Sequence, residues 1–506
     1  MKNISRYKSI AASVLTGALT LTLAHGQAAS KESKSESKQK PSAAKADKNS
    51  KTIKATVTID GKPLDYTVTA AELTLKTDSG KPRAKIFYTS YTAKPDLKRS
   101  ERPVLFAFNG GPGSSAVWLH LGALGPKIVP TSDDGTRPLQ PPVTLIDNPQ
   151  SILDVADLVF IDPVSTGYSR VGSAAKSSEF HSVDGDVASV GDFIRRWISE
   201  NKRWSSPKFL LGESYGGVRA AGLSSHLQSR YGMHLNGVVL LSGLLDYRTL
   251  NPSDGNDLSY VVYLPSLTAT ALHHGRIKGD RAALVADAKK FAETTYTNAL
   301  LKGYTLDPAT ADAVAVKLSE LTSLPKKLIL DMDLRISPTR FRAELLRDEQ
   351  KVLGRFDARV AWPTAQKSSA YPDFDPSFSV AKGAFSTAMK SYLTDDLDWD
   401  DSRIYEIITG NVHPWRYGAN NRYVNMAGSL ESALKDNPKL RILTLCGHTD
   451  LATPAGGILH SLDHLKIPAS LRKNLSVKWY DAGHMFYLNQ PDLIQLRKDL
   501  VEFIKQ

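Results

Sequence analysis

The chain has 506 residues, of which 41% are hydrophobic, so it can bury a large core either as one domain with an insertion or as two domains. Its formal net charge of +12 gives no reason to expect a nucleic-acid partner, because residues 1–28 contribute +3 and residues 29–54 contribute +5, which leaves +4 for the rest. The single cysteine, Cys446, excludes an internal disulfide and is expected to be a small buried residue.

The N-terminal region has the pattern of a secretory signal. Basic residues precede the apolar run Ile10–Ala24, and small residues follow it. We therefore expect a signal peptide over residues 1–28, export to the periplasm or the extracellular space, and no integral membrane segment after cleavage. A membrane anchor is the alternative, but the run is short and rich in Ala, Thr and Gly. Residues 29–54 are rich in Lys and nearly devoid of apolar residues, which predicts a disordered tether.

The folded part of the chain is expected to begin with antiparallel strands. Residues 52–100 contain alternating β-forming residues that break at Asp-Gly and Ser-Gly pairs. The continuous apolar run Pro103–Phe108 then predicts a strand that is buried on both faces. It leads into the glycine-rich loop Asn109–Ser115, whose backbone amides can approach a ligand closely. An ordinary Gly-Pro loop is the alternative interpretation.

Strands and helices alternate in the next part of the chain. Strands are expected at residues 156–162, 208–211 and 237–242, and helices at 183–200 and 218–231. This order predicts an α/β fold in which a mostly parallel sheet has helices on both faces. We assign residues 55–245 to the first part of this core.

The pattern changes after about Leu245. Helices are expected at residues 280–301, 309–324, 339–348 and 379–393, and the strand pattern returns at Leu440–Cys446 and Ser476–Tyr480. We therefore expect a helical insertion over residues 246–425 and the second part of the core over residues 426–506. The insertion is expected to cover the carboxyl edge of the sheet, where ligands bind in such folds.

The segment Gly212–Gly217 fits the nucleophile elbow G-x-S-x-G, with Ser214 at its centre. A short buried strand precedes it and a helix follows it, which is the context that the motif requires. A sharp turn between the two would expose the Ser214 hydroxyl above the sheet, and the helix N-terminus would face the place where negative charge develops. Ser214 is therefore the candidate nucleophile, and a structural turn is the alternative.

A serine nucleophile requires a base that is held by an acid. Asp450 and His484 both follow predicted strands, and the order Ser214, Asp450, His484 is the one that α/β-hydrolases use. Asp481 is a rival acid, but it lies on the same turn as His484 and is poorly placed to hold the ring. His448 is a rival base. The two histidines His460 and His464 have no nearby third ligand, so no metal site is expected there. No cofactor is expected either.

Together, the Asn109–Ser115 loop, the elbow, the Gly447–Asp450 loop and Gly483-His484 resemble the serine carboxypeptidase family. The resemblance implies an α/β-hydrolase with a helical insertion that removes C-terminal residues from peptides at acidic pH. It implies Ser214, Asp450 and His484 as the catalytic triad, and the amides of Gly111 and Tyr215 as the oxyanion hole. It also implies that Asn109, Gly110 and Glu213 bind the terminal carboxylate of the substrate.

The sequence departs from the family pattern at two places. Ser114 stands where the family has a cysteine, and the segment Trp118–Pro126 lacks the acidic residue that eukaryotic members often have in the carboxylate site. The resemblance is therefore to bacterial exported members, and the third group of the carboxylate site stays open. Burial is expected to raise the pKa of Glu213, which could then donate a hydrogen bond to a substrate carboxylate.

Two other functions are compatible with the sequence. An esterase or an acyltransferase could use the same triad, and a non-catalytic surface-binding protein could use the fold as a scaffold. The intact Ser, Asp and His positions favour an enzyme over the scaffold. The side-chain preference, the physiological substrate and the oligomeric state are not predicted.

Overall fold

The computed structural model describes residues 50–94 and 96–506, so the predicted signal peptide and residues 29–49 of the predicted tether lie outside the described residues. The remaining tether residues, 50–54, are not disordered, because they form the first half of strand β1 (Ser50–Ile59) and pair with β2. Alternation of Ile53, Ala55 and Val57 continues the two-residue period of the strand, and the high lysine content of the segment concealed it.

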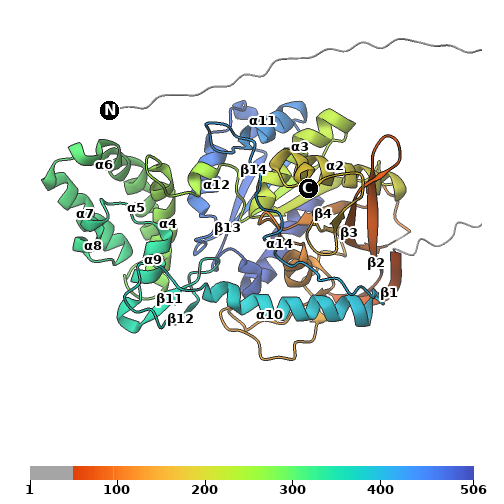
Figure 1. Cartoon of the computed structure of the whole chain (residues 1–506), viewed down its shortest axis with the longest axis horizontal. Coiled ribbons are helices and arrows are strands. Elements are labelled where there is room, and N and C mark those ends of the chain that lie inside the picture. Colours follow the sequence, from red (N-terminus) through yellow and green to blue (C-terminus); the bar gives the residue numbers. More distant parts are fainter. Residues whose placement is uncertain (1–49, 95) are drawn as a thin grey trace, which may run out of the picture. The chain divides into compact units, whose positions relative to one another are not determined.

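A single large sheet organises the described residues (Figure 1). Its order is β1-β2-β3-β7-β4-β9-β10-β13-β14, with β8 paired to β3. The strands are β1 (Ser50–Ile59), β2 (Lys62–Lys76), β3 (Pro82–Ala93), β4 (Val104–Phe108), β7 (Asp157–Ile161), β8 (Arg170–Val171), β9 (Lys208–Glu213), β10 (Gly237–Leu241), β13 (Arg441–Gly447) and β14 (Leu475–Tyr480). The first three strands are antiparallel, and β7, β4, β9, β10, β13 and β14 run parallel to one another. The prediction of a mostly parallel sheet with an antiparallel beginning is confirmed.

Each central strand is buried on both faces. Leu105 and Ala107 of β4 belong to one hydrophobic cluster, and Val104, Phe106 and Phe108 belong to the other. Helices α2 (Val183–Glu200), α3 (Tyr215–Tyr231), α11 (Ala427–Asp436) and α12 (Ala455–Asp463) pack on the second cluster, and α10 (Pro376–Ser391) and α14 (Gln490–Lys505) pack on the first. Two covered faces explain why the strands are continuous apolar runs.

Between β10 and α11 the chain is mostly helical. The helices there are α4 (Leu258–His273), α5 (Arg281–Phe291), α6 (Thr297–Lys302), α7 (Pro308–Thr322), α8 (Lys326–Asp331), α9 (Pro338–Glu344) and α10, and a hairpin joins β11 (Lys351–Leu353) to β12 (Ala361–Pro363). Helices α4 to α9 share a hydrophobic cluster of their own. The sequence patterns did not predict α4, α8 or the hairpin.

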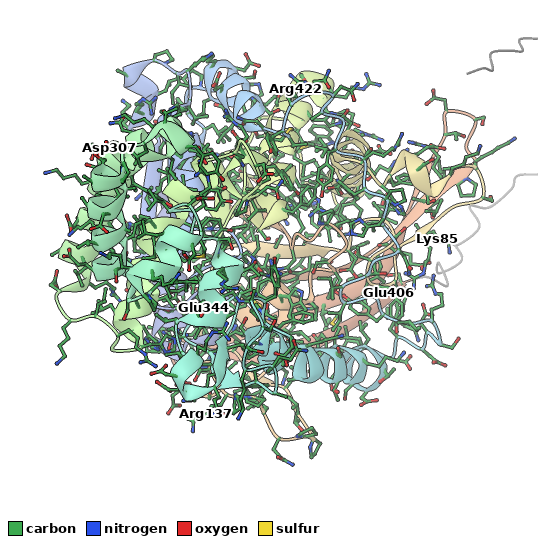
Figure 2. The ribbon with its side chains drawn as sticks, turned by 60° about the vertical axis from the view of Figure 1, so that its left-hand side comes forward. Lys85, Arg137, Asp307, Glu344, Glu406 and Arg422 are labelled. Carbon is green, nitrogen blue, oxygen red and sulfur yellow. The ribbon has the colours of Figure 1, made fainter. Side chains whose placement is uncertain are left out.

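Helices α4 to α9 lie at one side of the molecule, and strands β1, β2 and β3 lie at the opposite side (Figure 1). In Figure 2, Asp307 at the N-terminus of α7 and Glu344 at the end of α9 lie on one side, and Lys85 of β3 and Glu406 lie on the other. Within residues 50–94 and 96–506, no helix combines the length and the apolar character needed to cross a bilayer.

One buried ion pair connects two helices to the glycine-rich loop. Arg219 of α3 donates from Nε to Asp186 of α2 over 2.8 Å and from Nη1 to the Asn109 carbonyl over 2.6 Å. Arg219 is 1% exposed and Asp186 is 3% exposed. A buried pair contributes little net stability, but removal of one partner leaves an uncompensated charge in the core.

We therefore expect Arg219→Met to lower the free energy of unfolding by about 3–5 kcal/mol, because Asp186 would remain buried without its partner. Urea denaturation measures this change. The matched control is Lys327→Met, which removes the exposed pair between Lys327 and Asp331 and should cost less than about 0.5 kcal/mol. A cost below about 1 kcal/mol for Arg219→Met would show that the pair is not needed to hold α2, α3 and the loop together.

Candidate active site

Ser214 occupies a strained turn between β9 and α3. Its φ of 63° and ψ of −127° lie in a region that non-glycine residues rarely adopt, at a cost of about 1–3 kcal/mol. The Ser214 N–H donates to the Leu241 carbonyl, and the Ser214 carbonyl accepts from the amides of Gly217 and Leu244. A Cβ on Gly212 would lie 2.1 Å from the Gly216 carbonyl oxygen, so the turn closes only with glycine there. The predicted elbow therefore forms, held by its neighbours in the sheet.

The glycine-rich loop lies directly against this elbow. It follows β4, which pairs with β9. A Cβ on Gly110 would lie 2.5 Å from the Tyr215 nitrogen and 2.9 Å from the Ser214 Cβ. Gly111 has a φ of +101°, which a side chain rarely tolerates. In the part of the chain that the structure describes, the N–H groups of Gly111 and Tyr215 donate to no other backbone group.

His484 and Asp450 form a buried pair. His484 Nδ1 lies 2.8 Å from Asp450 Oδ2, and the exposed fractions of the two residues are 2% and 1%. The amides of Ala452 and Thr453 donate to Asp450 Oδ1 over 2.7 and 2.9 Å. Thr453 Oγ1 lies within hydrogen-bond distance of both His484 Nδ1 and Asp450 Oδ2. These contacts hold the Asp450 carboxyl in place and fix the plane of the imidazole ring.

The rival residues lie elsewhere. Asp481 pairs with Arg281 near the surface. His448 stacks on Trp479 at 4.7 Å, and burial lowers its pKa to about 4. The rings of His460 and His464 lie 4.0 Å apart, but among the described residues no three His, Cys, Asp or Glu side chains are grouped so as to hold a metal ion.

A segment that the sequence analysis did not single out supports both loops. Residues 355–358 follow β11 in the insertion. The Arg355 carbonyl accepts from the Leu451 amide, and the Phe356 carbonyl accepts from the His484 amide. Asp357 Oδ1 accepts from Thr449 Oγ1 over 2.9 Å. Most of these contacts use backbone atoms, which any residue type supplies, so no sequence signal could have revealed them.

Glu213 is the last residue of β9 and is 3% exposed. Tyr487 Oη donates to Glu213 Oε2 over 2.8 Å, and His484 Nε2 lies 3.9 Å from Glu213 Oε1. Burial raises the pKa of Glu213 to about 7, although His484 and the Tyr487 hydroxyl partly offset this effect. The nearby Asn109 accepts from the Leu119 amide with Oδ1, while its buried Nδ2 has no hydrogen-bond partner among the described residues.

These side chains meet in one cavity of about 320 Å³. The predicted site residues that line it are Asn109, Gly110, Gly111, Glu213, Ser214, Tyr215 and His484, and Asp450 lies behind His484. The other walls are largely apolar and include Trp118, Tyr247, Leu250, Phe378, Ile408 and Tyr417. Arg355 also lines the cavity, and its side chain is 48% exposed. The structure thus brings all the predicted site residues together.

The pKa of His484 depends on its partner. Burial alone would lower this pKa, but the Asp450 carboxylate and its hydrogen bond raise it above the ordinary value. We expect Asp450→Asn to remove the raising contribution, so that burial dominates and the pKa of His484 falls below about 6.5. NMR of the His484 imidazole over a pH series measures this pKa. Asp481→Asn is the matched control and should leave the pKa unchanged. An unchanged pKa in Asp450→Asn would mean that the pair is not ionic.

Comparisons with known proteins cover part of the chain. Residues 75–321 match the family described as serine carboxypeptidase, a span that includes the glycine-rich loop and the elbow but ends before Asp450. "Serine carboxypeptidase-like 1" of Arabidopsis thaliana is 30% identical over 176 residues, which are 33% of this chain and 37% of that protein. "Serine carboxypeptidase-like 13" of the same plant is 28% identical over 168 residues, which are 32% and 36%. The matches span about a third of the length of these relatives.

A solved structure extends the similarity to nearly the whole chain. Kex1(delta)p, a prohormone-processing carboxypeptidase from Saccharomyces cerevisiae, aligns with 86% of this chain and 91% of its own, with a TM-score of 0.54 and 16% sequence identity. At this identity the likeness concerns the fold. The chain therefore has the α/β-hydrolase fold, and nearly half of it matches the serine carboxypeptidase family.

Proposed function

We propose that this protein is a serine carboxypeptidase that releases C-terminal residues from peptides through an acyl-enzyme on Ser214. One observation carries the proposal: the cavity that contains Ser214 also contains a buried Glu213 whose pKa is about 7 and a buried Asn109 amide without a partner. A protonated carboxyl and an amide N–H are both donors. Two convergent donors beside a nucleophile suit a substrate carboxylate, which is the group that defines a peptide C-terminus.

In this proposal His484 takes the proton of Ser214 as the hydroxyl attacks the scissile carbonyl, and Asp450 stabilises the imidazolium that forms. The Gly111 and Tyr215 amides lie at the elbow and would donate to the developing oxyanion. The leaving amine takes the proton from His484, and water then hydrolyses the acyl-enzyme by the same route. Asn109, Gly110 and neutral Glu213 would hold the terminal carboxylate during these steps.

An esterase or acyltransferase activity on the same triad is the alternative, because the nucleophile and its base do not distinguish an amide from an ester. The donors at Glu213 and Asn109 favour the carboxypeptidase, since a neutral ester or amide terminus gives them no carboxylate to bind.

We also propose export of the protein, which the basic, apolar and small-residue pattern of residues 1–28 supports. Fractionation of expressing cells tests this second proposal.

We expect Ser214→Ala to lower kcat/KM for a peptide with a free C-terminus by at least about 10⁴-fold, because no other group on the elbow can form the acyl-enzyme. The melting temperature should not fall, since the hydroxyl makes no core contact. Ser229→Ala, an exposed serine on the same helix α3, is the matched control and should keep full activity. A near-normal rate for Ser214→Ala would exclude the acyl-enzyme.

The pH dependence of KM tests the carboxylate site. Glu213 is neutral below its pKa of about 7 and ionised above it, so KM for a peptide with a free C-terminus should rise by up to about 10-fold per pH unit above pH 7. The KM of the same peptide with a C-terminal amide should stay nearly flat, because it carries no charge to repel. Glu213→Gln should flatten the free-acid curve, since the amide donates without titrating.

The esterase alternative predicts no difference between the two substrates. Parallel KM curves for the free acid and the amide, or a Glu213→Gln variant that keeps the wild-type slope, would overturn the carboxylate site even if Ser214 proved essential.

A further inference from the structure

We propose that Tyr487 is the positioning residue of the carboxylate site. Its hydroxyl donates a hydrogen bond to Glu213 Oε2, so the proton of neutral Glu213 resides on the other oxygen, Oε1. Oε1 lies on the side of His484 and the cavity. The proposal rests on the proposed function and adds to it the group that orients the donor.

The hydrogen bond between Tyr487 and Glu213 is short and buried. Tyr487 Oη and Glu213 Oε2 are 2.8 Å apart, and the two residues are 1% and 3% exposed. Tyr487 lies in the turn Phe486–Leu488, directly after His484 and Met485. The hydroxyl therefore comes from the same loop as the proposed base, and the loop sets the positions of both groups relative to Glu213.

A glycine makes room for the Tyr487 ring. Gly122 lies in the π-helical turn His120–Leu124, and a Cβ there would lie 2.9 Å from Tyr487 Cε2 and 3.1 Å from the ring of Phe385. This turn belongs to the segment Trp118–Pro126, which has no carboxyl of its own. The segment thus admits a phenol in place of an acid, and a π-helical turn is a common feature of functional sites.

A phenol differs from a second acid in what it does to the proton. Burial, followed by the proximity of Glu213, raises the pKa of Tyr487 well above its ordinary value, so its hydroxyl remains a donor throughout the working pH range. A donor to the carboxyl favours the ionised form of Glu213. Tyr487 therefore orients the acid and at the same time lowers the pH above which Glu213 loses its proton.

His484 and Asp450 act on Glu213 through charge, and the neighbouring Asn109 amide also lowers its pKa. His484 lies 3.9 Å away and lowers the pKa of Glu213, whereas Asp450 raises it from behind the imidazole. Arg355 stands at the cavity wall on the insertion, and Asn109 of the loop after β4 is uncharged. Among the described residues Tyr487 is the side chain that donates a hydrogen bond of 2.8 Å to this carboxyl. Its removal should change the titration without a change of net charge.

The test is the KM–pH curve of Tyr487→Phe for a peptide with a free C-terminus. Loss of the donor should raise the pKa of Glu213, so the upper limit of peptide binding should move to higher pH by about one unit. At pH 8 a shift of one unit raises the neutral fraction of Glu213 by about 5-fold, so the variant should bind the free acid about as tightly as the wild type there. At low pH its KM should be several-fold higher, because the neutral carboxyl is no longer oriented. A purely structural role would weaken binding at every pH.

Three controls make the result specific. Tyr480→Phe removes another buried tyrosine–carboxylate bond, the 2.8 Å contact with Asp499, and should leave the curve unchanged. The amidated peptide should show no shift. Tyr487→Phe in the Glu213→Gln background should produce no shift either. If Tyr487→Phe does not fold, Gly122→Ala displaces the ring by one methyl group and should move the limit in the same direction.

Binding separates this proposal from the proposed function. The Kd of Ser214→Ala for the free-acid peptide, measured by calorimetry over the same pH range, reports the carboxylate site without turnover. A pH-dependent Kd that shifts with Tyr487→Phe supports the proposal even if the wild type hydrolyses no peptide. A pH-dependent Kd that is identical in both backgrounds, or a shift that Tyr480→Phe reproduces, would overturn it while leaving the carboxypeptidase intact.

Discussion

The contact between the glycine-rich loop and the elbow is the constraint on which the site depends. Gly110 approaches the Tyr215 nitrogen so closely that no Cβ fits between them, and strand pairing of β4 with β9 enforces this approach. Arg219 adds a second restraint, because it binds the Asn109 carbonyl while it neutralises Asp186. The loop, the nucleophile position and Glu213 are therefore fixed as one unit, and the strain at Ser214 is borne by this surrounding packing.

The segment between β10 and β13 supports the pair of Asp450 and His484. Asp450 and His484 come from two separate loops, and their hydrogen bond requires the loops to hold a constant separation. Residues 355–358 bind the backbone on both sides of this pair, at Leu451 and at His484. The ring of Phe356 also packs 5.1 Å from the ring of His484. A segment remote in sequence thus restricts the imidazole more directly than the strands β13 and β14, which position only the beginnings of the loops.

Sequence reasoning identified the site residues that have a chemical signature. The elbow needs small residues around Ser214, and Asp450 was separable from Asp481 because an acid three residues from His484 cannot face its ring. The site features that were not predicted from the sequence lack such a chemical signature. The support at residues 355–358 is made largely by backbone atoms, and Tyr487 resembles any core tyrosine until Glu213 is seen beside it. Strand β1 extends through Ser50–Lys54 because β2 pairs with it, which outweighs the lysine-rich composition.

Glu213 and His484, the two titrating groups of the cavity, require different pH ranges for their proposed roles. In the proposed reaction, Glu213 has to be neutral to receive a carboxylate, whereas His484 has to be neutral to accept the Ser214 proton. One group would then hold its proton at a pH where the other has lost it. Both pKa values are raised, that of Glu213 by burial and that of His484 by Asp450 against the effect of burial. Since the groups are 3.9 Å apart, ionisation of Glu213 favours a protonated His484 and would oppose both binding and attack. A bound carboxylate that shares the Glu213 proton keeps that carboxyl neutral. In the proposed carboxypeptidase, binding of a free C-terminus would therefore stabilise the neutral form of Glu213 that its own recognition requires, and this would tie catalysis to substrates with a free C-terminus.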